Sequence, residues 1–194
     1  MFEGSLGVRD TQQDVITLNI VSHSSAQTQR FGVRLGELLC GGELILLDGQ
    51  LGMGKTTFTQ GLAQGLGIPD TITSPTFTLL KEYSGLSRST IQEELRNTAP
   101  HIKRPALYHF DLYRLDDPEE IFDLGFEDYF YDSTGVCVVE WADKADGLWA
   151  SEKLRISMTI QNETERGLLF TASGTRYHEL LRRFQKNTHV TTRS

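Results

Sequence analysis

Residues 43–56 read Glu-Leu-Ile-Leu-Leu-Asp-Gly-Gln-Leu-Gly-Met-Gly-Lys-Thr, and this stretch decides the fold class. Its first part, Glu43–Asp48, is the short apolar run typical of a strand covered on both faces. Its second part, Gly49–Thr56, matches the pattern GxxxxGK[ST] at every fixed position. A helix is predicted to follow from about Thr56 to Leu66, where Gly67 ends it. Strand, glycine-rich turn and helix together predict a phosphate-binding loop.

The residue types in this loop suit a nucleotide. Glycines let the backbone curl so that several N–H groups converge, and the helix start adds partial positive charge where phosphates would sit. Lys55 would reach the β- and γ-phosphates, the Thr56 hydroxyl would ligate Mg²⁺, and Thr57 would donate a further hydrogen bond. A chance turn needs one or two glycines, not three followed by Lys-Thr. We therefore predict that the chain binds a nucleotide.

Two acidic residues follow later apolar runs. Asp111 comes directly after Ala106–Phe110, and Glu140 ends the run Val136–Glu140. A phosphate-binding loop needs a carboxylate for Mg²⁺ or water, usually at the end of a buried strand. The alternative for each acid is a solvated position at a strand end, where most acidic residues lie. Beside such a loop, we predict that both face the nucleotide.

Three neighbouring residues keep two interpretations each. His109 either orders a mobile segment near the phosphates or is a structural histidine with satisfied hydrogen bonds. Arg114 either neutralises phosphate charge or pairs with a nearby aspartate. Thr76, in the sequence Ser-Pro-Thr-Phe, either senses the γ-phosphate or belongs to a turn that enters the next strand.

Strands alternate with helices early in the chain, and a hairpin follows late. Further strands are predicted at 15–21, 77–83, 106–110, 136–140, 154–160 and 166–172, and further helices after Ser24, after Pro118 and over Thr175–Phe184. This pattern predicts one α/β domain of the P-loop NTPase type, with three layers and a mixed central sheet. The expected organisation is a flexible start at 1–14, an ATPase domain at 15–185 with a loop insertion at 84–105, and a flexible tail at 186–194.

Composition excludes several other classes of protein. The 194 residues carry 19 basic and 26 acidic side chains, a net charge of −7, which argues against a chain that grips nucleic acid alone. The two cysteines, Cys40 and Cys137, lie far apart and outside any zinc pattern. No apolar run is long enough to span a membrane, and the start lacks the features of a secretory signal. We expect a cytoplasmic protein with no membrane partner.

Two fragments resemble guanine-nucleotide motifs. Asp132–Gly135 looks like DxxG, and Asp143–Asp146 resembles NKxD with Asp in place of Asn. Only residues 136–142 separate them, whereas a crossover between parallel strands takes at least about 10–12 residues. We interpret both fragments as coincidence, so guanine specificity has no support.

Four motifs in order carry a family resemblance. The chain reads GQLGMGKTTF, then SPTFTLLKEY, then YHFDLYRL, then VVEW. This series resembles the TsaE (YjeE) family, the bacterial ATPases of threonylcarbamoyladenosine modification of tRNA, from about Val15 to Phe184. The resemblance implies hydrolysis of MgATP and action with the partners TsaB and TsaD, which would hold the tRNA.

The resemblance also implies roles for individual residues. Thr56 and Glu140 would ligate Mg²⁺, Asp111 would be needed for hydrolysis, and Thr76 would lie in a switch-like segment. The residues that would wrap the phosphates are Leu51, Gly52, Met53, Gly54, Lys55 and Thr56. Those that would border the rest of the nucleotide are Trp141, the residues Ser25 to Thr28 at the first helix, Asp143, and the turn of Glu165 and Arg166.

The chain departs from the family at two loop positions, with Gln50 in place of Asp and Met53 in place of Ala. Both are variable positions, so nucleotide binding is expected to survive.

Two other functions stay open. A small-molecule kinase would need a basic lid, for which only Arg88, Arg96 and Arg104 are candidates. A nucleotide-dependent binding module would need no turnover, and Asp111 and Glu140 argue against it.

Overall fold

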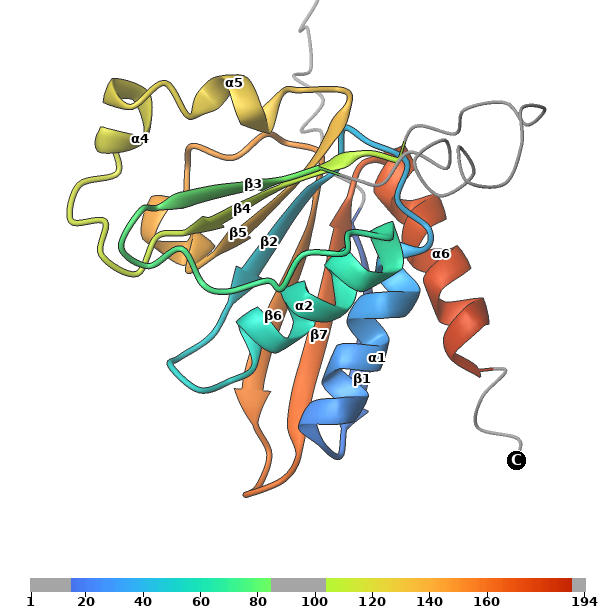
Figure 1. Ribbon diagram of the computed structural model, residues 1–194. Coiled ribbons are helices and arrows are strands. Elements are labelled where there is room, and N and C mark those ends of the chain that lie inside the picture. The colour runs from blue at the N-terminus through green and yellow to red at the C-terminus, as the bar shows by residue number, and fades with distance from the viewer. Residues whose placement is uncertain (1–14, 85–103, 190–194) are drawn as a thin grey trace, which may run out of the picture.

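The computed structural model describes residues 15–84 and 104–189, and within them seven strands form one sheet in the order β1-β7-β6-β2-β5-β4-β3 (Figure 1). The three strands β2, β5 and β4 run parallel, as do β2 and β6, while β1, β3 and β7 pair antiparallel with their neighbours. The sheet is therefore mixed, as predicted. The strands are β1 (Val15–Ser22), β2 (Leu44–Asp48), β3 (Leu80–Tyr83), β4 (Ala106–Asp111), β5 (Gly135–Glu140), β6 (Lys153–Ile160) and β7 (Arg166–Ser173).

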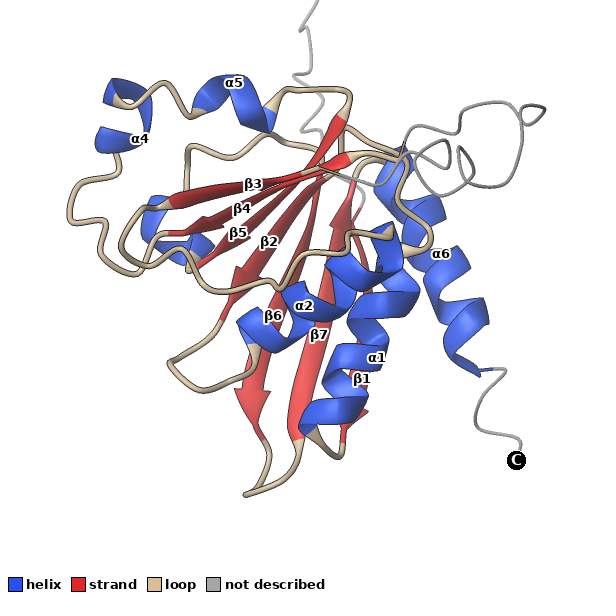
Figure 2. Ribbon diagram, in the orientation of Figure 1, coloured by secondary structure: helices blue, strands red, loops and turns tan. Residues whose placement is uncertain are grey.

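Helices cover both faces of the sheet, which confirms the three-layer α/β fold. Figure 2 shows α1 (Ser25–Gly36), α2 (Lys55–Leu66) and α6 (Thr175–His189) across one face. The other face carries the short helices α4 (Glu120–Asp123) and α5 (Glu127–Phe130) and the 3₁₀ turn η1 (Ala142–Ala145). Alternate residues of the central strands face opposite layers: Ile45 and Leu47 join the cluster under α1, α2 and α6, and Leu44 and Leu46 join the other. This alternation explains the unbroken apolar run of β2.

Helices α1 and α2 touch backbone to backbone. A Cβ atom added at Gly61 would lie 2.0 Å from the carbonyl oxygen of Gln29, and similar clashes would arise at Gly32, Gly36 and Gly65. We call these four residues the glycine seam. Because no side chain separates the two helices, the start of α2 is held at a fixed place beside the start of α1.

The strand predicted at 77–83 begins later than expected. The amides of Thr78 and Leu79 both donate to the carbonyl of Pro75, at 2.9 and 2.7 Å, which makes a turn. Leu79 adopts a left-handed φ of 61°, which no strand residue has. Strand β3 therefore begins at Leu80.

Other boundaries also differ from the prediction. The helix predicted after Ser24 is α1, for which the sequence places the end at Gly41–Gly42, whereas the structure ends it at Gly36; α6 continues past Phe184 to His189. The helix predicted after Pro118 is present as the single turn α4, and Gly125, with a φ of 68°, closes it. Helix α5 was not predicted.

Several predictions concern residues outside the described ranges: the flexible start at 1–14, most of the insertion at 84–105, and the end of the tail. Within the described ranges, no helix is long and apolar enough to cross a membrane.

Candidate nucleotide site

The phosphate-binding loop joins the carboxyl end of β2 to the amino end of α2 (Figure 1). Gly49 has a φ of 136°, and a Cβ there would lie 2.6 Å from the carbonyl oxygen of Met158, so glycine is required. Gly54 caps α2 with a φ of 100° and offers no side chain to the first helical N–H groups. These N–H groups are therefore available to an anion at the helix start.

Asp111 and Glu140 meet at the same edge of the sheet. They end the neighbouring parallel strands β4 and β5, and their Cα atoms are register partners. Glu140 also pairs in register with Leu47 of β2, directly before the loop. Both acids point to the face that carries α2, and both side chains are buried. The structure thus brings the two predicted carboxylates together beside the loop, at the edge where α/β proteins bind ligands.

Glu140 accepts hydrogen bonds at both carboxylate oxygens. Its Oε2 accepts from the Thr56 hydroxyl at 2.9 Å. Its Oε1 accepts from the Thr59 hydroxyl at 3.3 Å and lies 2.8 Å from Nε2 of His109. The predicted metal pair, Thr56 and Glu140, is therefore in direct contact. Thr59 was not predicted, although its place one helical turn after Lys55 puts it on the same face of α2.

Asp111 holds the turn that contains Thr76. Its Oδ2 accepts from the hydroxyls of Thr76, at 2.7 Å, and of Ser74. Its Oδ1 accepts from the backbone N–H of Tyr113 at 3.0 Å. Asp111 and Thr76, which were given separate roles from the sequence, are thus in direct contact, and Ser74, not singled out from the sequence, joins them.

Lys55 is buried, with 4% of its surface exposed. Its Nζ donates to the carbonyl oxygens of Gly49 and, at 3.1 Å, Gln50, and it lies 3.7 Å from the centre of the Trp141 ring. Burial lowers the pKa of Lys55, and the nearby carboxylates of Glu140, Asp111, Asp143 and Asp48 oppose this shift. Trp141 reaches this position through a left-handed φ of 59° directly after β5.

A cavity of about 320 Å³ lies beside the loop. Ser25, at the start of α1, lines it together with Gly52, Met53, Gly54 and Thr57 of the loop. The other lining residues are His23, Ser24, Thr28, Glu163, Thr164 and Arg166. Its place at the helix start suits the base and sugar of a nucleotide whose phosphates lie on the loop.

The remaining predicted residues lie around this centre. Glu165 does not line the cavity but accepts from Nδ1 of His23, which does, at 2.5 Å. Leu51 is 76% exposed at the tip of the loop. Asp143, on η1, lies close enough to the Asp48 carboxylate to influence its pKa and does not line the cavity.

The family can now be assigned. The family model for "Threonylcarbamoyl adenosine biosynthesis protein TsaE" matches residues 22–168, which include the loop and both carboxylates. The chain belongs to the TsaE family.

Relatives of known name support this assignment. The Bacillus subtilis protein named tRNA threonylcarbamoyladenosine biosynthesis protein TsaE is 39% identical over 149 residues, which cover 77% of this chain and 82% of the relative. The protein of the same name from Treponema pallidum is 42% identical over 143 residues, covering 74% and 89%. The crystal structure of Bacillus subtilis YdiB superposes with a TM-score of 0.68 at 31% identity and covers 91% of this chain and 99% of YdiB.

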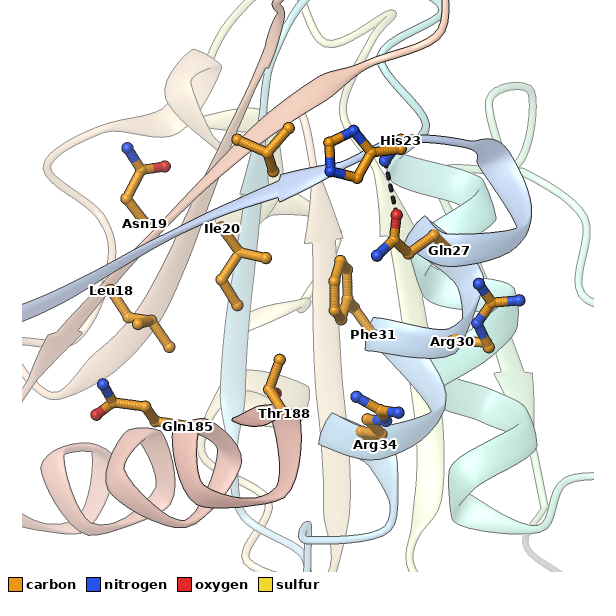
Figure 3. Close-up of a pocket in the computed structure, with 11 residues that line it drawn as sticks. Leu18, Asn19, Ile20, His23, Gln27, Arg30, Phe31, Arg34, Gln185 and Thr188 are labelled. Atoms are coloured by element: carbon orange, nitrogen blue, oxygen red, sulfur yellow. Dashed lines mark hydrogen bonds between the residues drawn. The ribbon is translucent and has the colours of Figure 1, made fainter. Parts of the chain in front are cut away.

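A larger cavity in this TsaE-family chain, of about 520 Å³, lies between β1, α1 and α6 (Figure 3). Leu18, Ile20 and Phe31 give it an apolar floor, and Arg30 and Arg34 stand on its α1 side. It contains none of the predicted site residues and no paired hydroxyl and carboxylate. Chemistry, and not cavity size, therefore places the candidate site at the loop.

The remaining ambiguous residues also have defined places. Asp132 precedes β5, at the end opposite the loop, where it accepts from the Tyr108 hydroxyl at 2.6 Å. This position agrees with our interpretation of the DxxG-like fragment as coincidence. The guanidinium of Arg114 lies 4.3 Å from the centre of the Phe77 ring, next to the Thr76 turn.

Proposed function

We propose that this TsaE-family chain is an ATPase that hydrolyses MgATP to ADP and phosphate. Its role would be in forming threonylcarbamoyladenosine in tRNAs that read codons beginning with adenine, in company with TsaB and TsaD. The observation that carries the proposal is the contact of Thr56 with Glu140 at the mouth of a phosphate-binding loop. The names of the relatives support the pathway.

The residues present fit a magnesium ion that arrives with the nucleotide. Thr56 and Glu140 offer hard oxygen donors side by side, 2.9 Å apart. The described residues contain no cluster of three or more His, Cys, Asp or Glu side chains that could hold a metal without a ligand. Mg²⁺ usually binds through one or two carboxylates together with substrate phosphates and water, which is what this site offers. Bound there, the ion would neutralise charge on the phosphate oxygens.

The protein groups would act on the phosphates mainly through charge. Lys55 and the N–H groups at the start of α2 would stabilise negative charge on the transferring phosphoryl group. Lys55 now bonds to loop carbonyls, so it would exchange these partners for phosphate oxygens. Asp111 would position the attacking water and, through Ser74 and Thr76, the turn beside the γ-phosphate.

Exposed apolar side chains surround the site and favour a protein partner. We call Leu51, Phe77 and Tyr113 the apolar rim, and their exposed fractions are 76%, 83% and 44%. Large exposed apolar groups gathered around one place mark an interaction surface. The net charge of −7 leaves the tRNA phosphates to the partners.

The kinase alternative gains no support from its one described lid candidate. Arg104 donates to the carbonyl oxygen of Gly65 at 3.3 Å, near the carboxyl end of α2 and away from the loop.

The test is phosphate release from MgATP by the purified chain, alone and with purified TsaB–TsaD. We expect release that the pair stimulates, and loss of release in Lys55→Ala by a factor of at least about 100, because one key donor of charge stabilisation is gone. Lys186→Ala, which changes an exposed lysine of α6 outside the site, is the matched control. Normal turnover in Lys55→Ala would contradict the site assignment. Tight ATP binding without turnover, even with partners, would favour the binding module, and transfer of phosphate to a metabolite would favour the kinase.

A further inference from the structure

His109 lies in the middle layer of the protein, on the face of β4 that carries Asp111. Its side chain is fully buried, and Glu140 is 2% exposed. Nε2 of His109 lies 2.8 Å from Oε1 of Glu140. His109 is the register partner of Val138, two residues before Glu140, so the two polar side chains share one face of the parallel pair β4–β5.

This contact separates the roles of the two carboxylate oxygens of Glu140. Oε1 lies 2.8 Å from Nε2 of His109 and 3.3 Å from the Thr59 hydroxyl, whose single proton also faces the carbonyl oxygen of Lys55 at 3.1 Å. Oε2 faces only the Thr56 hydroxyl among the described residues. The terminal torsion of a free glutamate is broad, so an unsupported carboxylate group could rotate about its Cγ–Cδ bond. The short contact with His109, assisted by the Thr59 hydroxyl, holds Oε1 in place and so aims Oε2 at Thr56.

The hydrogen-bonding state of His109 follows from its partner. A carboxylate offers only acceptors, so a hydrogen bond across the 2.8 Å contact requires the proton on Nε2 of His109. The other ring nitrogen, Nδ1, is buried and has no hydrogen-bond partner among the described residues. A side chain that only filled space would be better as leucine or phenylalanine, because a buried unpaired nitrogen costs free energy.

We propose that His109 is a positioning residue: it donates from Nε2 to Oε1 of Glu140 and thereby aims Oε2, beside Thr56, at the magnesium ion of the bound nucleotide. The inference rests on the proposed function, because it assigns a support to that site's metal ligand. His109 touches neither the nucleotide nor the reacting atoms, so it acts through Glu140 alone. Partners of this kind typically change metal affinity by about 10–100-fold when they are removed.

The experiment measures binding of a fluorescent ADP analogue, N-methylanthraniloyl-ADP, across a titration of MgCl₂. In His109→Leu we expect the Mg²⁺ concentration for half of the magnesium-dependent binding gain to rise about 10–100-fold. Binding without Mg²⁺ is expected to stay as in the wild type. His109→Gln, whose side-chain N–H can reach the same oxygen, should restore most of the wild-type Mg²⁺ dependence. The Mg²⁺ concentration for half-maximal hydrolysis should follow the same order.

His178→Leu is the matched control. His178 of α6 is also a buried histidine with an unpartnered ring nitrogen, Nε2, and it lies outside the site. We expect this variant to keep the wild-type Mg²⁺ dependence, whatever its melting temperature. Thr59→Val removes the other donor to Oε1 and should shift the Mg²⁺ dependence in the same direction as His109→Leu, which keeps the proposal testable if that variant does not fold.

The possible outcomes separate this inference from the proposed function. An unchanged Mg²⁺ dependence in both His109→Leu and Thr59→Val, in a wild type whose binding does depend on Mg²⁺, overturns the positioning role alone. A His109→Gln variant as impaired as His109→Leu also overturns it, since the N–H group would not be what matters. If nucleotide binding by the wild type ignores Mg²⁺ altogether, the proposed metal site fails, and the positioning role fails with it.

Discussion

The ammonium group of Lys55 now makes weaker contacts than a bound phosphate would offer it. It is buried, burial lowers its pKa, and its ammonium group rests on loop carbonyls and on the ring of Trp141. A cation over an aromatic face is stabilised by about 0.5–2 kcal/mol, which is less than a charged phosphate partner offers. Lys55 should therefore leave the ring when a nucleotide binds.

This movement of Lys55 should change the fluorescence emission of Trp141. In a Trp149→Phe background, where Trp141 is the remaining tryptophan, MgADP should cause a saturable change in tryptophan emission because the cation above the ring is withdrawn. The change should vanish in the double variant Trp141→Phe/Trp149→Phe. It should also be greatly reduced in Lys55→Met, provided that ADP binding is saturated. An unchanged emission in the Trp149→Phe protein at saturating MgADP would show that Lys55 stays where it is.

Asp48, the last residue of β2, makes stability depend on pH. Burial raises its pKa above 3.8, more than Arg155, 3.3 Å away, lowers it. The stability that Asp48 contributes is therefore complete below pH 3.8 and is lost as pH rises through the raised pKa. Asparagine cannot ionise, so the melting temperature of Asp48→Asn relative to wild type should increase between pH 4 and pH 7. Thermal melts of both proteins across this pH range test the prediction. Asp70→Asn, at an exposed position, is the control for the lost charge. A melting-temperature difference between Asp48→Asn and wild type that falls with pH would contradict the prediction.

At the scale of single residues, the sequence identifies the candidate site residues that belong to a local pattern. Lys55 and Thr56 belong to a fixed motif, and Asp111 and Glu140 are the acids that close apolar runs. Ser74, Thr59 and Asp48 act through partners that are distant in sequence, so no local pattern distinguishes them from ordinary polar residues. His109 was left with two interpretations because the sequence does not show which strand lies next to β4.

At the scale of elements, the contact between α1 and α2 determines where the phosphate loop can be. Gly61→Ala would place a methyl group 2.0 Å from the carbonyl oxygen of Gln29, within the glycine seam. Alanine favours an isolated helix by about 1 kcal/mol, but overpacking typically costs about 1–3 kcal/mol. We expect a net loss in the free energy of unfolding, measured by urea denaturation. Gln64→Ala, at an exposed position of the same helix, should change it by less than about 0.5 kcal/mol; a stabilised Gly61→Ala would show that the helices can separate freely.

The sequence predicts the types of most elements and little of their arrangement. The runs of β2, β4 and β5 are apolar enough to identify buried strands, and the late hairpin is visible as two runs around a polar turn. Strand order depends on pairing between distant segments, which periodicity does not report. The glycines of the seam look like helix-weakening residues until α1 and α2 are seen in contact. The start of β3 depends on one left-handed residue, Leu79, whose side chain gives no sign of that conformation.

At the scale of the whole molecule, the apolar rim offers a test of partner docking. Phe77→Ala should weaken the stimulation of hydrolysis by TsaB–TsaD, with about a 10-fold higher concentration of the pair needed, since truncating a central aromatic contact often costs more than about 1 kcal/mol. Nucleotide affinity should change little. Tyr131→Ala is the control: Tyr131 is 70% exposed and lies before β5, at the end of the sheet opposite the loop. Equal effects of the two variants would argue against docking at the rim.

The glycine seam also has a consequence for local unfolding of the protein. Backbone groups that interlock cannot be exposed to solvent one helix at a time, so the amides of α1 and α2 should exchange their hydrogens in one cooperative event. A nucleotide held at the start of α2 would then slow exchange along the whole of α1, including turns that it never touches. The short helix α4 lies far from the seam, and Ile121 is its one buried residue. Its amides would therefore exchange faster, independently of those of α1 and α2.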